Sequence, residues 1–352
     1  MTAPPGWTAL LDLPLTGIEG TDKAEKIRRG MLIHATVPRP PVGLHPSEVI
    51  HRHDKLEVRY YAPVGQRVGT PTVLVPSLIN KAYILDLEPG RSLVEALTAA
   101  GHPTYLVDWG VPEEEDGDED VAYVLLDLLH RSIERICRHA ASRQANLLGY
   151  CMGGTLAAMY AALRPERVAR LLVLAAPIRF ADGGRFRDLV SALDVDASMQ
   201  DGLVPVSAMK PAFQLLDPVG NYTKYLGIEA AAKKPESLRR AMARERWLEE
   251  NIPISAAFAR EFVKCGYQED RLMSGTWEIR GQNVDLRAIR CPTLVATCEG
   301  DFITPAAAAA PLAEMVPGAR EVRLPTGHIG VVVGAEGPKR FYPLVDQFFR
   351  GE

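Results

Sequence analysis

One cysteine stands in a short glycine-rich turn, Gly149-Tyr150-Cys151-Met152-Gly153. The spacing G-x-C-x-G matches the turn that presents a nucleophile between a strand and a helix, with cysteine in place of the usual serine. A thiol held there can attack an acyl carbonyl and carry the acyl group as a thioester. The pattern alone is weak, because any glycine-rich turn can hold an inert buried cysteine. Its interpretation therefore depends on finding a base and an acid elsewhere in the chain.

His328 is the candidate base, since it is the only histidine after Cys151. Enzymes with this type of turn order their catalytic residues as nucleophile, acid and histidine along the chain. His328 follows an expected strand over Glu321–Leu324 and lies between two glycines, in a loop that can reach across the sheet edge. The alternative is a surface histidine that titrates freely. We predict that His328 activates Cys151.

Asp301 is the candidate acid, because it follows an expected strand over Thr293–Thr297 and precedes the histidine. Glu299 competes for the same role from two residues earlier. Asp301 could instead cap the next helix, but Thr304, directly before Pro305, is expected to supply that cap. This leaves Asp301 to hold the imidazole in the required tautomer.

Two backbone N–H groups are expected to stabilise the oxyanion. The first belongs to Met152, which follows the nucleophile. The second should come from the loop Ser77–Asn80, which follows an expected strand over Thr72–Val75, and we assign it to Ile79. No metal is assigned, since the acidic run Glu113–Asp120 has the composition of a solvated loop.

Short apolar runs alternate with helical segments around these residues. Because parallel strands place ligands beyond their carboxyl ends, each candidate lies where such a sheet would put its chemistry. The pattern predicts an α/β-hydrolase fold, with a doubly wound, mostly parallel sheet and a lid insertion. The expected elements are strands at Lys55–Tyr60, Thr72–Val75, Thr104–Val107, Ala145–Gly149, Val168–Ala175, Thr293–Thr297 and Glu321–Leu324, and helices at Asp22–Thr36, Ser92–Ala100, Val121–His139, Gly154–Leu163, from Pro305 through the following alanines, and at the C-terminus.

The alternation of strands and helices fails over part of the chain, and this sets the expected boundaries. We predict an N-terminal extension over 1–48, a hydrolase core over 49–181 and 282–352, and a lid insertion over 182–281. The lid would cover the carboxyl ends of the strands, where it could keep water from a reactive intermediate.

Composition excludes several classes of protein. A net charge of −4 provides no basic field for nucleic acid. Five cysteines without a C-x-x-C pair argue against a zinc site and against a secreted disulfide framework. No apolar run reaches the ~20 residues of a membrane span, and no secretion signal is evident at the N-terminus. We therefore expect a cytoplasmic enzyme without a membrane span, metal or cofactor.

Several motifs go beyond the general features of a hydrolase: Asn80–Leu87, Val107–Gly110, the Cys151 turn, Gly281–Leu286, Gly300–Asp301 and Gly327–Gly330. In these motifs the sequence resembles the catalytic subunit of polyhydroxyalkanoate synthases, most closely the short class III type. The resemblance implies that Cys151 carries the growing polyester, His328 activates it and Asp301 assists attack by the substrate hydroxyl. It further implies (R)-3-hydroxyacyl-CoA as substrate, free CoA as product, and a companion synthase subunit; we also expect a homodimer and a place on the polyester granule surface. Arg179, where the family usually has an acid, and Met152 depart from the pattern.

The choice of cysteine favours acyl transfer over hydrolysis. A thioester on Cys151 is close in energy to an acyl-CoA donor and stays reactive toward an alcohol. Two alternatives remain open: a cysteine hydrolase of the same fold, such as a polyester depolymerase or thioesterase, and a non-catalytic granule-associated protein.

Overall fold

The computed structural model describes residues 21–199 and 202–352. The chain forms two compact units. The larger comprises Val42–Leu216 and Glu250–Glu352, and the smaller comprises the described part of Met1–Pro41 with Asp217–Glu249.

The larger unit is built on an eight-stranded sheet in the order β1-β2-β6-β3-β7-β8-β13-β14. The pairs β1–β2 and β2–β6 are antiparallel, and every later neighbour pairs in parallel. This mostly parallel order confirms the predicted fold class. The strands are β1 (Glu48–His53), β2 (Leu56–Tyr61), β3 (Thr72–Val75), β6 (Thr104–Asp108), β7 (Ala145–Tyr150), β8 (Val168–Leu174), β13 (Thr293–Cys298) and β14 (Arg320–Leu324).

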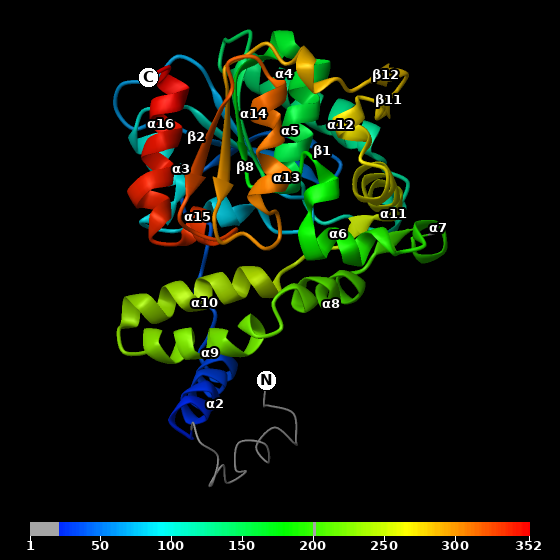
Figure 1. The fold of residues 1–352 in the computed structure, drawn as a ribbon. Coiled ribbons are helices and arrows are strands. Elements are labelled where there is room, and N and C mark those ends of the chain that lie inside the picture. The colour runs from blue at the N-terminus through cyan, green and yellow to red at the C-terminus, as the bar shows by residue number, and fades with distance from the viewer. Residues whose placement is uncertain (1–20, 200–201) are drawn as a thin grey trace. The chain divides into compact units, whose positions relative to one another are not determined.

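Helices cover both faces of this sheet (Figure 1). The central strands β3, β7 and β13 are buried along their whole length, as their continuous apolar sequences require. On one side lie α4 and α5, and on the other lie α3 and α16. Their bounds are α3 (Leu93–Ala99), α4 (His130–His139), α5 (Met152–Leu163) and α16 (Tyr342–Arg350).

Two predicted helices differ from those in the structure. The predicted helix Val121–His139 contains a π-helical stretch, Tyr123–Leu129, before α4 begins. The helix expected from Pro305 begins one residue later and is broken into α13 (Ala306–Ala309) and α14 (Pro311–Met315), because Pro311 has no N–H for a continuous helix.

The segment predicted as a lid contributes to both units. In the larger unit it forms several short elements, and residues 217–249 cluster instead with the N-terminal segment. The predicted lid boundaries therefore remain a prediction. The elements in the larger unit are α6 (Gly184–Ser191), α7 (Val195–Ser198), β9 (Leu203–Val204), α8 (Val206–Leu216), β10 (Ile254–Ser255), α11 (Ala256–Glu261), the π-helical Phe262–Gln268 and α12 (Arg271–Ser274).

The smaller unit packs the predicted N-terminal helix, α2 (Thr21–Thr36), against α9 (Gly220–Ala231) and α10 (Pro235–Glu249). The helices α2 and α9 approach closely at Gly30, where an added Cβ would lie 2.0 Å from the carbonyl oxygen of Tyr225. Only glycine fits this crossing.

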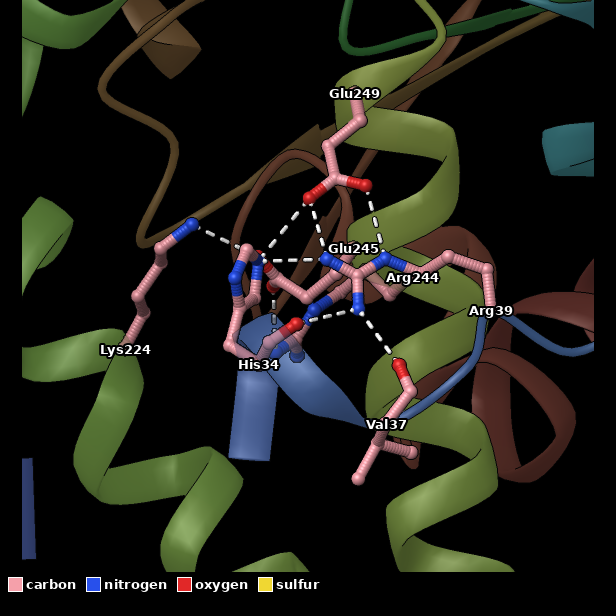
Figure 2. A network of polar contacts seen from close by, with 7 residues as sticks. All are labelled: His34, Val37, Arg39, Lys224, Arg244, Glu245 and Glu249. Atoms are coloured by element: carbon pink, nitrogen blue, oxygen red, sulfur yellow. Dashed lines mark hydrogen bonds and ion pairs between the residues drawn. The ribbon is translucent and has the colours of Figure 1, made fainter. Parts of the chain in front are cut away.

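A network of charges ties these helices together (Figure 2). Glu245, whose side chain is 1% exposed, lies 2.8 Å from Lys224 Nζ and 3.4 Å from His34 Nε2. Arg39 donates to Glu249 at 2.9 Å through Nε, and to the carbonyl of His34. Burial opposes the charge of Glu245, but the bonds from His34 and Lys224 outweigh it and hold the pKa of its carboxyl at about 2.

This carboxyl should make the smaller unit acid-sensitive. Its pKa is depressed from 4.5, so its contribution is complete above pH 4.5 and is lost as pH falls toward 2. The contribution is at most about 3 kcal/mol. Hydrogen exchange of peptides from Thr21–Thr36 and Pro235–Glu249, corrected for intrinsic rates, should accelerate over this window. In the Glu245→Gln variant, these peptides should already exchange fast at neutral pH. The control is Glu236→Gln, which changes a side chain that is 81% exposed on the same helix, and its exchange rates should match those of wild type. Equal protection in both variants would contradict this assignment.

Candidate active site

Cys151 occupies a strained turn between β7 and α5. Its backbone has φ 57° and ψ −132°, a conformation that costs a non-glycine residue about 1–3 kcal/mol. The turn is held on both sides, because Cys151 N donates to Leu174 O at 2.9 Å and Cys151 O accepts from Gly154 N at 2.8 Å. The strain places the thiol beyond the carboxyl end of β7, as the sequence predicts.

The glycines around Cys151 allow this turn to form. An added Cβ on Gly149 would lie 2.5 Å from Gly153 O, and one on Gly153 would lie 2.2 Å from Val75 O and 2.4 Å from Pro76 O. These neighbours are backbone atoms, which cannot move aside as a flexible side chain could. The motif residues therefore let α5 approach the end of β3.

Replacing Gly153 by alanine should damage both stability and activity. The clash with the end of β3 is expected to cost about 1–3 kcal/mol in urea unfolding and to displace Cys151. Gly227→Ala is the matched control, since that helical glycine has nothing within 4 Å of an added Cβ. It should stabilise the protein by roughly 0.5–1 kcal/mol. A Gly153→Ala variant as stable and active as wild type would show that the elbow tolerates a side chain.

His328 and Asp301 form a buried pair. His328 Nδ1 lies 2.7 Å from Asp301 Oδ2, and their side chains are 7% and 0% exposed. Asp301 Oδ1 accepts from the N–H groups of Ile303 and Thr304 at 2.9 and 2.8 Å. The expected cap at Thr304 is wrong: the residue before α13 is Pro305, which has no side chain able to cap. Asp301 orders this turn and holds the imidazole at the same time.

The loops that carry this pair are joined to each other. Gly300 N donates to Thr326 O at 2.9 Å, and Glu299 N donates to Leu324 O at 3.0 Å. Glu299, the competing acid, is exposed. The structure thus brings Asp301, and not Glu299, to the imidazole.

The surroundings of His328 stabilise its protonated form. Burial alone disfavours the imidazolium, but negative charge on Cys151 and Asp301, with hydrogen bonds to both, raises the pKa of His328 to about 10. Because Nδ1 is bound to Asp301, Nε2 is the nitrogen left for Cys151. The structure therefore brings together all three predicted residues.

Two aromatic residues support this arrangement, and sequence reasoning missed both. The buried Tyr150 donates from its hydroxyl to His328 O at 3.1 Å, and the two rings lie 5.2 Å apart. Tyr267 lines the pocket beside Cys151, with its ring edge-on to Phe180 and Phe186 at 4.8 and 5.3 Å. The sequence could have pointed to Tyr150, because it directly precedes Cys151. No sequence feature pointed to Tyr267 as a neighbour of the site.

An apolar pocket of about 240 Å³ opens on Cys151. Met152 and Ile79, the residues assigned to the oxyanion site, both line it. Ile79 is anchored through its carbonyl, which accepts from Ile252 N at 3.1 Å. Their oxyanion role remains a prediction. Apolar side chains from α6, α8 and the region of α11 form much of the wall, among them Phe186, Val190, Met209, Phe213, Phe258 and Phe262.

Other classes of site find little support in the described ranges. Within residues 21–199 and 202–352, no group of three or more His, Cys, Asp or Glu side chains is placed to hold a metal. In those same ranges no helix has the length and apolarity needed to cross a bilayer. In the acidic run, Glu113 and Glu115 pair with Lys55 at 2.7 and 3.0 Å.

Comparison with solved structures supports the fold. A thermophilic esterase from Thermogutta terrifontis superposes with a TM-score of 0.53 and 16% identity, over 87% of this chain and 98% of that one. A hydrolase from Pseudomonas aeruginosa gives 0.52 and 18%, over 87% and 99%. At these identities the likeness concerns the fold alone.

Comparison with protein families and curated proteins is more specific. The alpha/beta hydrolase fold family matches residues 73–335, and the poly-beta-hydroxybutyrate polymerase (PhaC) N-terminus matches residues 40–97. Poly(3-hydroxyalkanoate) polymerase subunits PhaC from Haloferax mediterranei, Haloarcula marismortui and Thiocystis violacea are 31%, 30% and 27% identical over 89%, 88% and 94% of this chain. The chain spans 65%, 68% and 95% of their respective lengths. It therefore belongs to the poly(3-hydroxyalkanoate) polymerase PhaC family, built on the α/β-hydrolase fold.

Proposed function

We propose that this chain polymerises (R)-3-hydroxyacyl-CoA into polyhydroxyalkanoate through a thioester on Cys151. The observation that carries the proposal is the meeting of Cys151, His328 and Asp301 at an apolar pocket, in a chain of this family. The relatives are named poly(3-hydroxyalkanoate) polymerase subunits, which supports the same class of polymer product.

The first half-reaction loads the enzyme. His328 Nε2 takes the thiol proton of Cys151, and the sulfur attacks the thioester carbonyl of the substrate. The carbonyl oxygen becomes an oxyanion, and we assign its stabilisation to the backbone N–H of Met152, which follows the nucleophile. Collapse of this intermediate breaks the bond to the CoA sulfur. The leaving sulfur takes the proton from His328 and departs as free CoA.

The second half-reaction forms the ester. The 3-hydroxyl of another acyl-CoA attacks the thioester carbon on Cys151 while His328 accepts its proton. The bond to Cys151 breaks, its sulfur recovers the proton, and the lengthened chain remains attached to CoA. Return of that chain to Cys151 by the first half-reaction releases another CoA. Asp301 holds the imidazole in place through both halves.

The pocket favours transfer over hydrolysis. Its apolar lining gives water few hydrogen-bonding partners near the thioester, whereas a 3-hydroxyacyl chain can bury its methylene groups there. The acyl transfer from CoA sulfur to Cys151 exchanges one thioester for another, so it is nearly balanced in energy.

The proposal extends to partners and location. We infer a companion synthase subunit, a homodimer and a place in the cytoplasm, on the polyester granule surface. These inferences follow from the resemblance to class III synthases. The molecular mass of the chain in solution, measured with and without a class III companion subunit, tests this assembly. A dimer alone and a larger complex with the companion are expected.

Product analysis tests the activity. The purified chain, alone and with a class III companion subunit, is incubated with (R)-3-hydroxybutyryl-CoA, and the products are separated. Chloroform-soluble polyester formed in step with free CoA is the expected result. Soluble 3-hydroxybutyrate as the sole acyl product would instead identify a hydrolase, and no CoA release in either arm would reject an acyl-transfer enzyme.

A further inference from the structure

Ser77 is a buried serine in the loop that directly follows β3. The residue is 4% exposed, and its Oγ has no hydrogen-bond partner among the residues that the structure describes. A hydroxyl buried without a partner costs about 1–3 kcal/mol. Ser77 also lines the pocket that contains Cys151. An unpaired donor at this place is better explained by a ligand than by the fold.

The backbone before Ser77 is fixed against the nucleophile turn. The Pro76 carbonyl accepts from Trp109 Nε1 at 3.0 Å, and Trp109 is itself buried. The same carbonyl lies so close to Gly153 that an added Cβ would be 2.4 Å away. Ser77 is therefore held beside the first turn of α5, where the Met152 N–H is located.

The other hydroxyls of the pocket differ from that of Ser77. Ser198 is exposed and lies on α7, Thr304 belongs to the turn that Asp301 orders, and Tyr267 is held among aromatic rings. Of the pocket-lining residues that the structure describes, Ser77 alone carries a buried polar side-chain atom without a partner. This singles it out as a donor available to a substrate.

We propose that the Ser77 hydroxyl donates a hydrogen bond to the acyl oxygen while that oxygen carries negative charge. This inference deepens the proposed function and rests on it. When Cys151 sulfur bonds to the carbonyl carbon, the π electron pair moves to oxygen, and Ser77 Oγ–H joins the Met152 N–H in binding it. When the pair returns and the CoA sulfur leaves, the hydrogen bond weakens. Ser77 keeps its proton throughout.

Ser77→Ala separates this role from a structural one. Because the hydroxyl makes no bond within the described fold, its removal should leave the melting temperature unchanged or raise it. The kcat for CoA release should fall by roughly 10²-fold, with KM little changed. Ser77→Thr, which keeps a donor, should recover most of the rate. Ser274→Ala, at an exposed serine of α12 outside the pocket lining, should match wild type in turnover and in melting temperature.

The outcomes distinguish the two proposals. If Ser77→Ala turns over at the wild-type rate while Cys151→Ala does not, Ser77 is no donor and the proposed function stands. If Ser77→Ala loses stability in proportion to its loss of activity, the residue is structural and the inference fails. If CoA release persists in Cys151→Ala, the proposed function itself is wrong.

Discussion

Replacing Cys151 by alanine should lower CoA release from (R)-3-hydroxybutyryl-CoA by on the order of 10³- to 10⁶-fold, the range seen when an enzyme loses its nucleophile. The reason is that no other cysteine can replace it: the remaining four are buried, and Cys151 alone is partly exposed. A thiol-reagent assay of CoA release in the presence of saturating substrate measures the effect.

Cys137→Ala is the matched control. Cys137 is a buried cysteine on α4, 3% exposed and away from the pocket lining. This variant should retain the wild-type rate and lose only a little stability. Comparable rates in the two variants would mean that acyl transfer does not pass through Cys151.

Replacing His328 by alanine should cause a loss of similar size, since the thiol of Cys151 then has no base and the leaving CoA has no acid. The loss should affect the acylation step itself. The pre-steady-state burst of CoA, measured with substrate in excess over enzyme, should therefore slow by at least roughly 10³-fold. His53→Ala removes a histidine of the edge strand β1 and should leave the burst unchanged. An unaltered burst in His328→Ala would exclude this residue as the base.

The pKa of His328 should depend on both of its partners. Asp301 and Cys151 together raise it to about 10, so Asp301→Asn or Cys151→Ala should lower it. Titration of the His328 ring by NMR would detect the change.

The sequence was sufficient to select the three residues that the structure brings together, Cys151, His328 and Asp301. The turn around Cys151 is recognised by its glycines at fixed spacing. Each of the three predicted side chains follows a strand that the short apolar runs predict. Chain order then left one histidine for the base. For Asp301 the same reasoning selected the residue that the structure pairs with His328. It placed the helix cap wrongly at Thr304, because a turn and a helix start look alike before a proline.

What the sequence could not reveal depends on contacts between distant segments. The pairing of α2 with α9 and α10 rests on the close approach of Gly30 to Tyr225 and on the contacts of Glu245 with His34 of α2 and Lys224 of α9. No local sequence pattern encodes contacts between such distant residues. Ser77 is a similar case. A serine after a strand is common. Only the packed structure shows that its hydroxyl is buried, that it has no partner among the described residues, and that Ser77 lines the pocket that contains Cys151.

The central claim is a covalent acyl chain on Cys151, and mass spectrometry tests it most directly. Wild-type protein is mixed with (R)-3-hydroxybutyryl-CoA, quenched in acid within the first turnovers and digested. The peptide that contains Cys151 should carry one or more 3-hydroxybutyryl units that hydroxylamine removes, and the same peptide from Cys151→Ala should carry none. Acylation of a different residue, or CoA release and polymer formation with Cys151 unmodified, would contradict the account.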